Sequence, residues 1–220
     1  MTTGDRLPQA KDLAMPSRRR TTARRPLPKR ARSTDRLVHF YFSNQPQREL
    51  GYYAGAFLEA ARTLMRSHRR RGGFSKVAAA PVLFMYRHSI ELYLKAIIVT
   101  GSRSVAASAD DDEKLFKTLG SHKLLPLLSR VEGVFKLVGW EWHWPLNPLV
   151  ETAEHARELL GNFDNLDPGS FAFRYPVDKH GRRSIATDIH FNLESVVAAL
   201  DALAEALETA DFGLEAALEG

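Results

Sequence analysis

Four ionisable side chains lie inside an otherwise apolar run at residues 81–100, PVLFMYRHSIELYLKAIIVT. They are Arg87, His88, Glu91 and Lys95. On a helix that advances about 100° per residue, all four fall within a stripe roughly 100° wide. Apolar residues cover the remaining arc, so we expect a helix that is buried on most of its surface and presents this stripe along one edge.

The stripe has two interpretations. As a solvated charge ladder, its pairs Arg87–Glu91 and Glu91–Lys95 would each stabilise the helix by only about 0.2–0.5 kcal/mol. As a functional or interface edge, it would face a ligand, a partner protein or a second copy of the chain. If the charges are buried they must be paired, and they could then fix the geometry of a bundle or a dimer.

Metal-free cleavage of RNA is one reaction that such residues could support. A base must take the proton of the 2′-hydroxyl group, and a cation must stabilise the charge that develops on the phosphate. Histidine titrates near neutral pH, and arginine binds phosphate oxygens in a bidentate manner. The candidate bases are His88, His122 and His180, and the candidate phosphate clamps are Arg87 and Arg174.

Structural roles are open for several of the same residues. His122 directly follows Ser121, a plausible N-cap, and could complete the N-terminus of a helix. Arg174 could bond a carboxylate such as Glu91 and so pin its own segment. Three tryptophans within residues 140–145 are expected to form an aromatic lid on the core rather than a ligand cage.

Composition bounds the class of protein. The chain has 220 residues, of which 44% are hydrophobic and 26% charged, a balance typical of a globular protein with one core. With no cysteine, it has no disulfide, no thiol nucleophile and no cysteine metal site. No His-x-x-x-His pair occurs, so we predict neither a metal nor a cofactor. Charged residues interrupt the longest apolar run and no signal peptide is evident, so we expect a cytoplasmic protein with no membrane partner.

The net charge of +5 is unevenly distributed along the chain. Residues 1–34 carry ten Lys or Arg and two Asp, a net +8, so the remainder carries −3. This segment has few apolar residues and four prolines, and we expect a disordered basic tail that could bind RNA, DNA or an anionic surface. A solvated arm, or an extension upstream of a start at Met15, is the alternative.

Apolar periodicity predicts the helices. The pattern indicates five of them, at residues 45–71, 77–100, 121–138, 148–163 and 192–208. Residues 102–113 are predicted to form a polar loop, and residues 170–190 a small β-hairpin or flap. The expected fold is all-α, an antiparallel up-and-down bundle of four to five helices with this flap before the last helix. The expected domain spans residues 35–212, followed by a C-terminal tail at residues 213–220.

Three segments in this order resemble HEPN-type helical-bundle proteins. They are YRHSIELYLKA at residues 86–96, SHKL at residues 121–124 and FRYPVD at residues 173–178. The resemblance covers roughly residues 45–210. It implies an antiparallel bundle that commonly dimerises, in a superfamily associated with toxin–antitoxin systems, phage defence and RNA processing. Many members are metal-independent ribonucleases.

The resemblance also implies site residues. Ribonuclease members carry an arginine followed, after four to six residues, by a histidine, and Arg174–His180 is the best placed match. The implied partners are RNA, a second copy, and an antitoxin or nucleotidyltransferase. A different class remains open, in which the chain is a non-catalytic module. It would bind a partner protein or a nucleotide through the Arg87 edge and through the 170–190 flap, which contains Tyr175 and Asp178.

Overall fold

The computed structural model describes residues 43–70, 75–103, 109–145, 147–185 and 188–219. The predicted basic tail at residues 1–34 therefore lies outside the described residues. The described part is helical, which confirms the all-α class. Its elements, in chain order, are the short 3-10 helix η2 (Pro46–Glu49), then α1 (Leu50–Arg70), α2 (Lys76–Ser102), α3 (Ala109–Leu119), α4 (Leu124–Leu137), α5 (Ala153–Leu166) and α6 (Leu193–Glu219).

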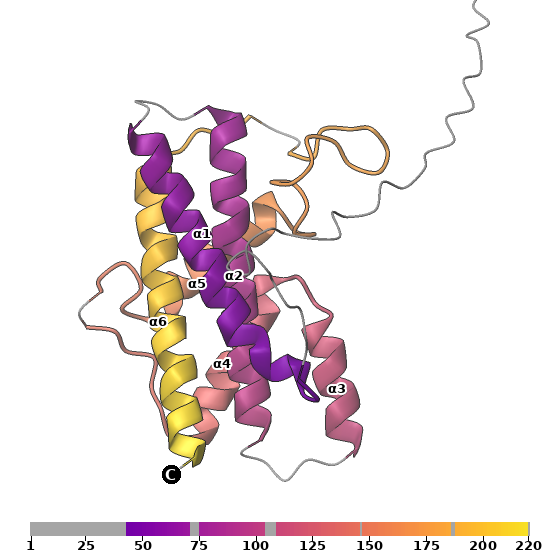
Figure 1. Cartoon of the computed structure of the whole chain (residues 1–220), viewed down its shortest axis with the longest axis vertical. Coiled ribbons are helices and arrows are strands. Elements are labelled where there is room, and N and C mark those ends of the chain that lie inside the picture. The colour runs from indigo at the N-terminus through magenta and orange to yellow at the C-terminus, as the bar shows by residue number, and fades with distance from the viewer. Residues whose placement is uncertain (1–42, 71–74, 104–108, 146, 186–187, 220) are drawn as a thin grey trace, which may run out of the picture. The chain divides into compact units, whose positions relative to one another are not determined.

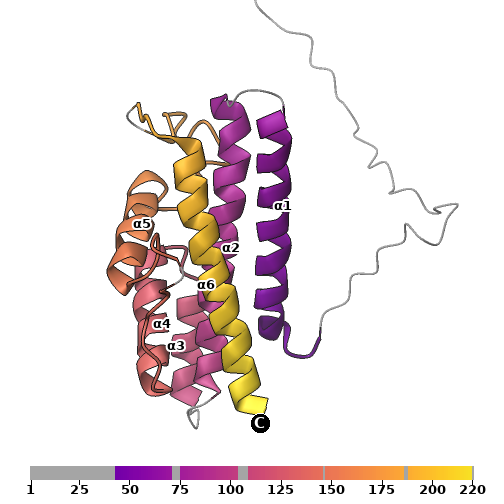
Figure 2. The ribbon, with the colours of Figure 1, turned by 90° about the vertical axis from the view of Figure 1, so that its left-hand side faces the viewer.

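Helix α2 is the centre of the packing. It contacts α1, α6 and α4, and α4 in turn contacts α5. Figures 1 and 2 show α1, α2 and α6 side by side. From Val82 to Gly101 almost every α2 residue is buried, as the apolar run at residues 81–100 predicts. Ser75 begins the helix by accepting a hydrogen bond from the backbone N–H of Ala78 at 3.2 Å.

Helix α6 runs parallel to α2 and is joined to it by a regular polar ladder, so the predicted antiparallel up-and-down arrangement is not confirmed. Three α2 hydroxyls each donate to an α6 carboxylate: Tyr86 to Asp201 at 3.0 Å, Tyr93 to Glu208 at 2.7 Å, and Thr100 to Glu215 at 3.0 Å. Each pair is separated by 115 positions, and successive rungs are one heptad apart. A constant offset requires parallel helices in one register, with the seven-residue spacing of a coiled-coil seam.

Several predicted boundaries are wrong. The helix expected at residues 148–163 is α5, which begins at Ala153 and ends at Leu166. Residues 109–113, predicted to lie in a loop, belong to α3. Residues 213–219, predicted to form a C-terminal tail, continue α6, because this last part still packs against the rest of the molecule. Leu214 is fully buried, and Gly213 lies so close to the Trp140 ring that an added Cβ would be 3.2 Å from it.

The predicted flap contains little β-structure. The described residues hold no β-strand, and the segment has one isolated antiparallel bridge, between Val177 and Arg183. The turn inside this bridge contains Gly181 at a φ of 75°, a conformation that favours glycine. The aromatic lid is present as expected: all three tryptophans pack against the core, and the Trp142 indole N–H donates to the carbonyl of Val150 at 3.1 Å.

Candidate functional site

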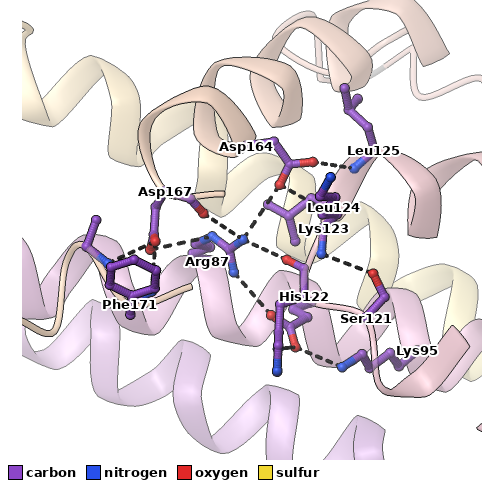
Figure 3. A network of polar contacts seen from close by, with 12 residues as sticks. Arg87, Lys95, Ser121, His122, Lys123, Leu124, Leu125, Asp164, Asp167 and Phe171 are labelled. Carbon is purple, nitrogen blue, oxygen red and sulfur yellow. Dashed lines mark hydrogen bonds and ion pairs between the residues drawn. The ribbon is translucent and has the colours of Figure 1, made fainter. Parts of the chain in front are cut away.

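The Arg87 guanidinium is fully buried in α2 and makes three hydrogen bonds inside the protein (Figure 3). Nη1 donates to Glu91 Oε2 at 3.1 Å. Nη2 donates to two backbone carbonyls, that of His122 at 2.7 Å and that of Asp167 at 3.1 Å. One side chain thus ties α2 to the segment before α4 and to the end of α5. The interpretation of the stripe as a solvated ladder is wrong, and Arg87 is not accessible as a phosphate clamp.

Asp164 on α5 links this arginine to the start of α4. Its Oδ1 lies 3.6 Å from Arg87 Nη2. Its two oxygens also accept hydrogen bonds from the backbone N–H groups of Leu124 and Leu125, at 2.9 Å each. The free N–H groups at the N-terminus of α4 are therefore satisfied by a carboxylate from another helix.

This arrangement corrects the predicted N-cap. The residue at the cap position of α4 is Lys123, whose side chain makes no capping bond. Ser121 instead accepts a hydrogen bond from the Lys123 N–H at 3.2 Å, outside the helix. The capping function expected of Ser121 belongs to Asp164.

Asp167 is the second acid at the end of α5, and unlike Asp164 it has no exposed surface. Its Oδ1 accepts from the backbone N–H groups of Phe171 at 2.7 Å and Ala172 at 2.9 Å. Its Oδ2 lies 3.8 Å from Arg87 Nε, and neither of these two atoms has a hydrogen-bond partner. They form a close, fully buried ion pair without a direct hydrogen bond.

Sequence reasoning missed Asp164 and Asp167, although a signal existed. Acidic residues in the last turn of a helix are unfavourable, because the C-terminal end of the helix dipole is negative. Asp164 and Asp167 follow the helix predicted at residues 148–163. Their position therefore indicated that cations from other parts of the chain pair with them. The pattern by itself predicts only the end of a helix at this point.

Glu91 is the centre of the network. Its side chain is 1% exposed and accepts from Arg87, from Lys95 Nζ at 2.8 Å and from His122 Nδ1 at 2.9 Å. Burial by itself would raise the pKa of Glu91, but the Lys95 ammonium and the His122 ring outweigh it and hold the pKa below its ordinary value. The carboxylate is therefore ionised at neutral pH.

His122 is the point at which this network reaches solvent. Its side chain is 58% exposed, although the carboxylate that it contacts is buried. The ring contacts Glu91 Oε1 through Nδ1, so this contact does not use Nε2. This orientation of an imidazole by a carboxylate is the one that general bases use. The His122 side chain contacts Glu91 and does not complete the N-terminus of α4, which was its alternative predicted role.

His88 is separated from the rest of the stripe by its contacts. Its ring packs edge-on against Phe57, with centroids 4.5 Å apart, and stacks on Phe84 at 5.6 Å. Burial lowers the pKa of His88, so the ring is neutral at neutral pH. His88 therefore shares the face of Glu91 and Lys95, but its ring is half-buried between two phenylalanines and makes none of the hydrogen bonds described for Glu91.

The flap places its predicted residues apart from the buried network. The Arg174 guanidinium carbon lies over the rings of Phe84, at 5.3 Å, and Tyr175, at 5.7 Å. This is a cation–π arrangement, and it replaces the expected bond to Glu91. Both Arg174 and Tyr175 are exposed.

Asp178 and His180 form the turn of the flap. Asp178 Oδ1 accepts from the backbone N–H groups of His180 at 2.8 Å and Arg182 at 2.9 Å. Its Oδ2 accepts from the Arg182 guanidinium at 3.0 and 2.8 Å. The backbone bond from Arg182, followed by its side chain, lowers the pKa of Asp178. Asp178 therefore shapes this turn, and His180 is an exposed residue at its tip.

Among the described residues, no helix is long and apolar enough to cross a membrane. The same part of the chain gathers no group of three or more His, Cys, Asp or Glu side chains suited to a metal ion. No protein-family model, curated protein or solved structure matches the chain. The HEPN resemblance therefore stays a prediction.

Proposed function

We propose that this chain is a HEPN-like, RNA-associated protein that binds the RNA backbone through the loop at residues 174–183. One observation carries the proposal. These ten residues include four Arg or Lys and a single acid, a net +3. That acid, Asp178, is held by Arg182, and the four cationic side chains are exposed.

The physical basis is counterion release. Lys and Arg side chains that neutralise phosphates displace bound cations, which supplies affinity without sequence preference and makes it salt-dependent. Tyr175 is 56% exposed beside Arg174 and offers a ring on which a base can stack. Loop and ring together form the kind of surface that binds single-stranded RNA.

The test is a salt titration of RNA binding with a matched pair of variants. Lys179→Gln/Arg183→Gln removes two loop charges and leaves Arg182 to hold Asp178. We expect weaker binding of labelled single-stranded RNA in fluorescence anisotropy. The slope of log K against log salt should fall by about 0.7 for each phosphate that the variant no longer neutralises.

Lys117→Gln/Lys136→Gln is the control. This variant also replaces two cations by glutamine, so it changes the net charge by the same amount. Both lysines are exposed, one on α3 and one on α4. Both variants retain residues 1–34, so any contribution of the basic tail is unchanged. Equal salt slopes for the two variants would contradict the proposal.

A second candidate function is metal-independent cleavage of RNA, of the toxin or phage-defence type that the resemblance implies. The observation that favours it is the exposed His122 ring, oriented by the buried Glu91 at 2.9 Å. In this function His122 takes the 2′-hydroxyl proton. Arg87 is fully buried, so it does not supply the cation that holds the phosphate.

Cleavage is tested by incubating the purified protein with RNA in EDTA. If His122 is the base, His122→Ala abolishes cleavage at unchanged RNA affinity, whereas His180→Ala does not. No cleavage by the unaltered protein, with binding intact, would leave the non-catalytic binding module as the function. Cleavage unaffected by His122→Ala, His88→Ala and His180→Ala would exclude all three bases.

A further inference from the structure

An apolar groove with a volume of about 370 Å³ lies between α5, the start of α6 and one turn of α2. Its walls include three phenylalanines, Phe163, Phe173 and Phe191, together with Leu83 and Val196. Phe163 and Phe173 are buried at 4% and 7% exposure, whereas Phe191 is 43% exposed at the edge. The volume lies within the range of about 300–1,000 Å³ typical of small-molecule sites.

The basic loop begins next to this groove. Phe173, in the groove wall, is followed directly by Arg174, the first cation of the loop. The chain comes back to the groove at Ile189, His190 and Phe191. An RNA whose phosphates contact Arg174 at the start of the loop therefore lies next to Phe173 of the groove wall.

Polar groups at the groove suit a heterocycle. Asn162 and Asn165 lie one turn apart on α5 and line the groove, and His190 lines it as well. All three residues are exposed. An amide offers both a donor and an acceptor, the combination that reads the edge of a nucleobase. Unstacked RNA bases are commonly recognised by stacking on aromatic rings and by hydrogen bonds to their edges.

We infer that this groove binds one unstacked base of an RNA whose phosphates contact the 174–183 loop. We assign a base as the occupant because the groove has aromatic walls and amides at its mouth, and because the cationic loop starts next to it. The inference rests on the proposed RNA binding and adds the mode of recognition. In it, the face of the base contacts Phe191, and the edge of the base is directed to Asn162 and Asn165.

The experiment compares Phe191→Ala with Phe212→Ala in the full chain. Phe212 is 77% exposed on α6 and does not line the groove, so its substitution controls for removal of an exposed phenylalanine. The probes are one labelled single-stranded RNA and the same RNA with abasic sites. We expect Phe191→Ala to weaken binding of the intact RNA about tenfold at unchanged salt slope, and Phe212→Ala to leave it unchanged.

The abasic RNA should bind the two variants equally, because it has no base to insert. Asn162→Ala/Asn165→Ala, which changes only exposed amides, provides a second variant whose folding is not in question. It should reduce discrimination among RNAs that differ in base, with little change in affinity for the abasic strand.

The outcomes separate the two proposals. Salt-sensitive binding that Phe191→Ala and the double Asn variant both leave unchanged would overturn the groove and retain the loop. No salt-sensitive RNA binding by the full chain would overturn both. A change of oligomeric state on gel filtration for Phe191→Ala, with RNA affinity intact, would assign the groove to a second copy and refute the inference.

Discussion

The Arg87 network and the 174–183 loop both concentrate charge, but they use it in opposite ways. In the network, each charged group has a counter-ion or hydrogen-bond partner within the protein, and Arg87, Glu91 and Asp167 have almost no exposed surface. In the loop, the cations are exposed and exceed the acids by three. Two loop cations have partners at the surface, Arg182 with Asp178 at 2.8 Å and Arg183 with Asp188 at 3.5 Å. Burial commits charges to internal partners, whereas exposed pairs are weak and leave their cations accessible to an external partner.

This difference separates charges that look alike in the sequence by what they hold together. Asp164 and Asp178 illustrate it, since each accepts two backbone N–H groups and an arginine contact. Asp164 joins α5 to α4 and α2, whereas Asp178 closes a turn within its own loop. Removal of the first should affect the whole fold and removal of the second only the loop.

The largest expected effect is that of Arg87→Met. It removes the ion pair of the buried Asp167 and leaves the buried Glu91 with Lys95 and His122 as its remaining partners. Removal of one partner of a buried pair typically destabilises by about 3–5 kcal/mol. Urea unfolding followed by circular dichroism measures the change. A decrease below about 1 kcal/mol would show that the network contributes little to the fold.

The next effect concerns Asp211, a partly buried acid that forms no ion pair with any residue that the structure describes. Burial, together with Glu215 and Glu208, raises the pKa of Asp211 to about 7. One of its oxygens is buried without a partner, and the other lies against Gly51 on α1. Because the folded pKa is above the unfolded one, Asp211 favours the protonated folded state, and stability falls as pH rises from about 4 to about 7.

Asp211→Asn should therefore stabilise the protein at pH 8, on the order of 1–2 kcal/mol after allowance for solvent access, and have little effect near pH 4. Thermal or urea unfolding of both proteins across this pH range measures the difference. A variant that is less stable than the parent protein at pH 8 would show that the ionised carboxylate is favourable there. Asp211 would then resemble Glu91, whose ionised carboxylate is favourable in the folded protein.

Asp164→Ala tests the join between α5 and α4. It frees two N–H groups at the start of α4 and removes one acid near Arg87. Removal of an N-terminal cap typically costs about 1 kcal/mol, with a range of about 0.5–2. Denaturant unfolding checks this value, and Ser121→Ala serves as the control because Ser121 does not cap the helix. Equal destabilisation of the two variants would place the cap at Ser121.

The smallest effect on stability is expected in the loop. Lys179→Gln/Arg183→Gln changes only exposed side chains, so the free energy of unfolding should change by less than about 0.5 kcal/mol. The same variant should show the largest decrease in RNA binding. A strongly destabilised variant would mean that the loop charges support the fold as the network charges do.

Much of the helical layout could be predicted from periodicity. The burial of α2 followed from the run at residues 81–100, and the apolar face of α6 from its leucines, because a helix with one apolar face must cover that face. The hairpin was overestimated, since alternation alone does not show that two strands will pair. The end of α6 was missed because the packing of Gly213 on Trp140 joins distant segments.

The ladder between α2 and α6 is present in the sequence but could not be recognised from it. Its hydroxyls and carboxylates repeat every seven residues, yet each bond spans 115 positions. Only a known pairing of the two helices makes the shared spacing meaningful.

The order and periodicity of residues were enough to place the ionisable stripe on one face of a largely buried helix. They did not establish what covers that face. The partners of Arg87 lie 35 and 80 positions away, at His122 and Asp167. Folding brings those groups against α2 and so buries the stripe. Helical spacing determines only which side of the helix a residue lies on, whereas tertiary packing decides which residues contact that side.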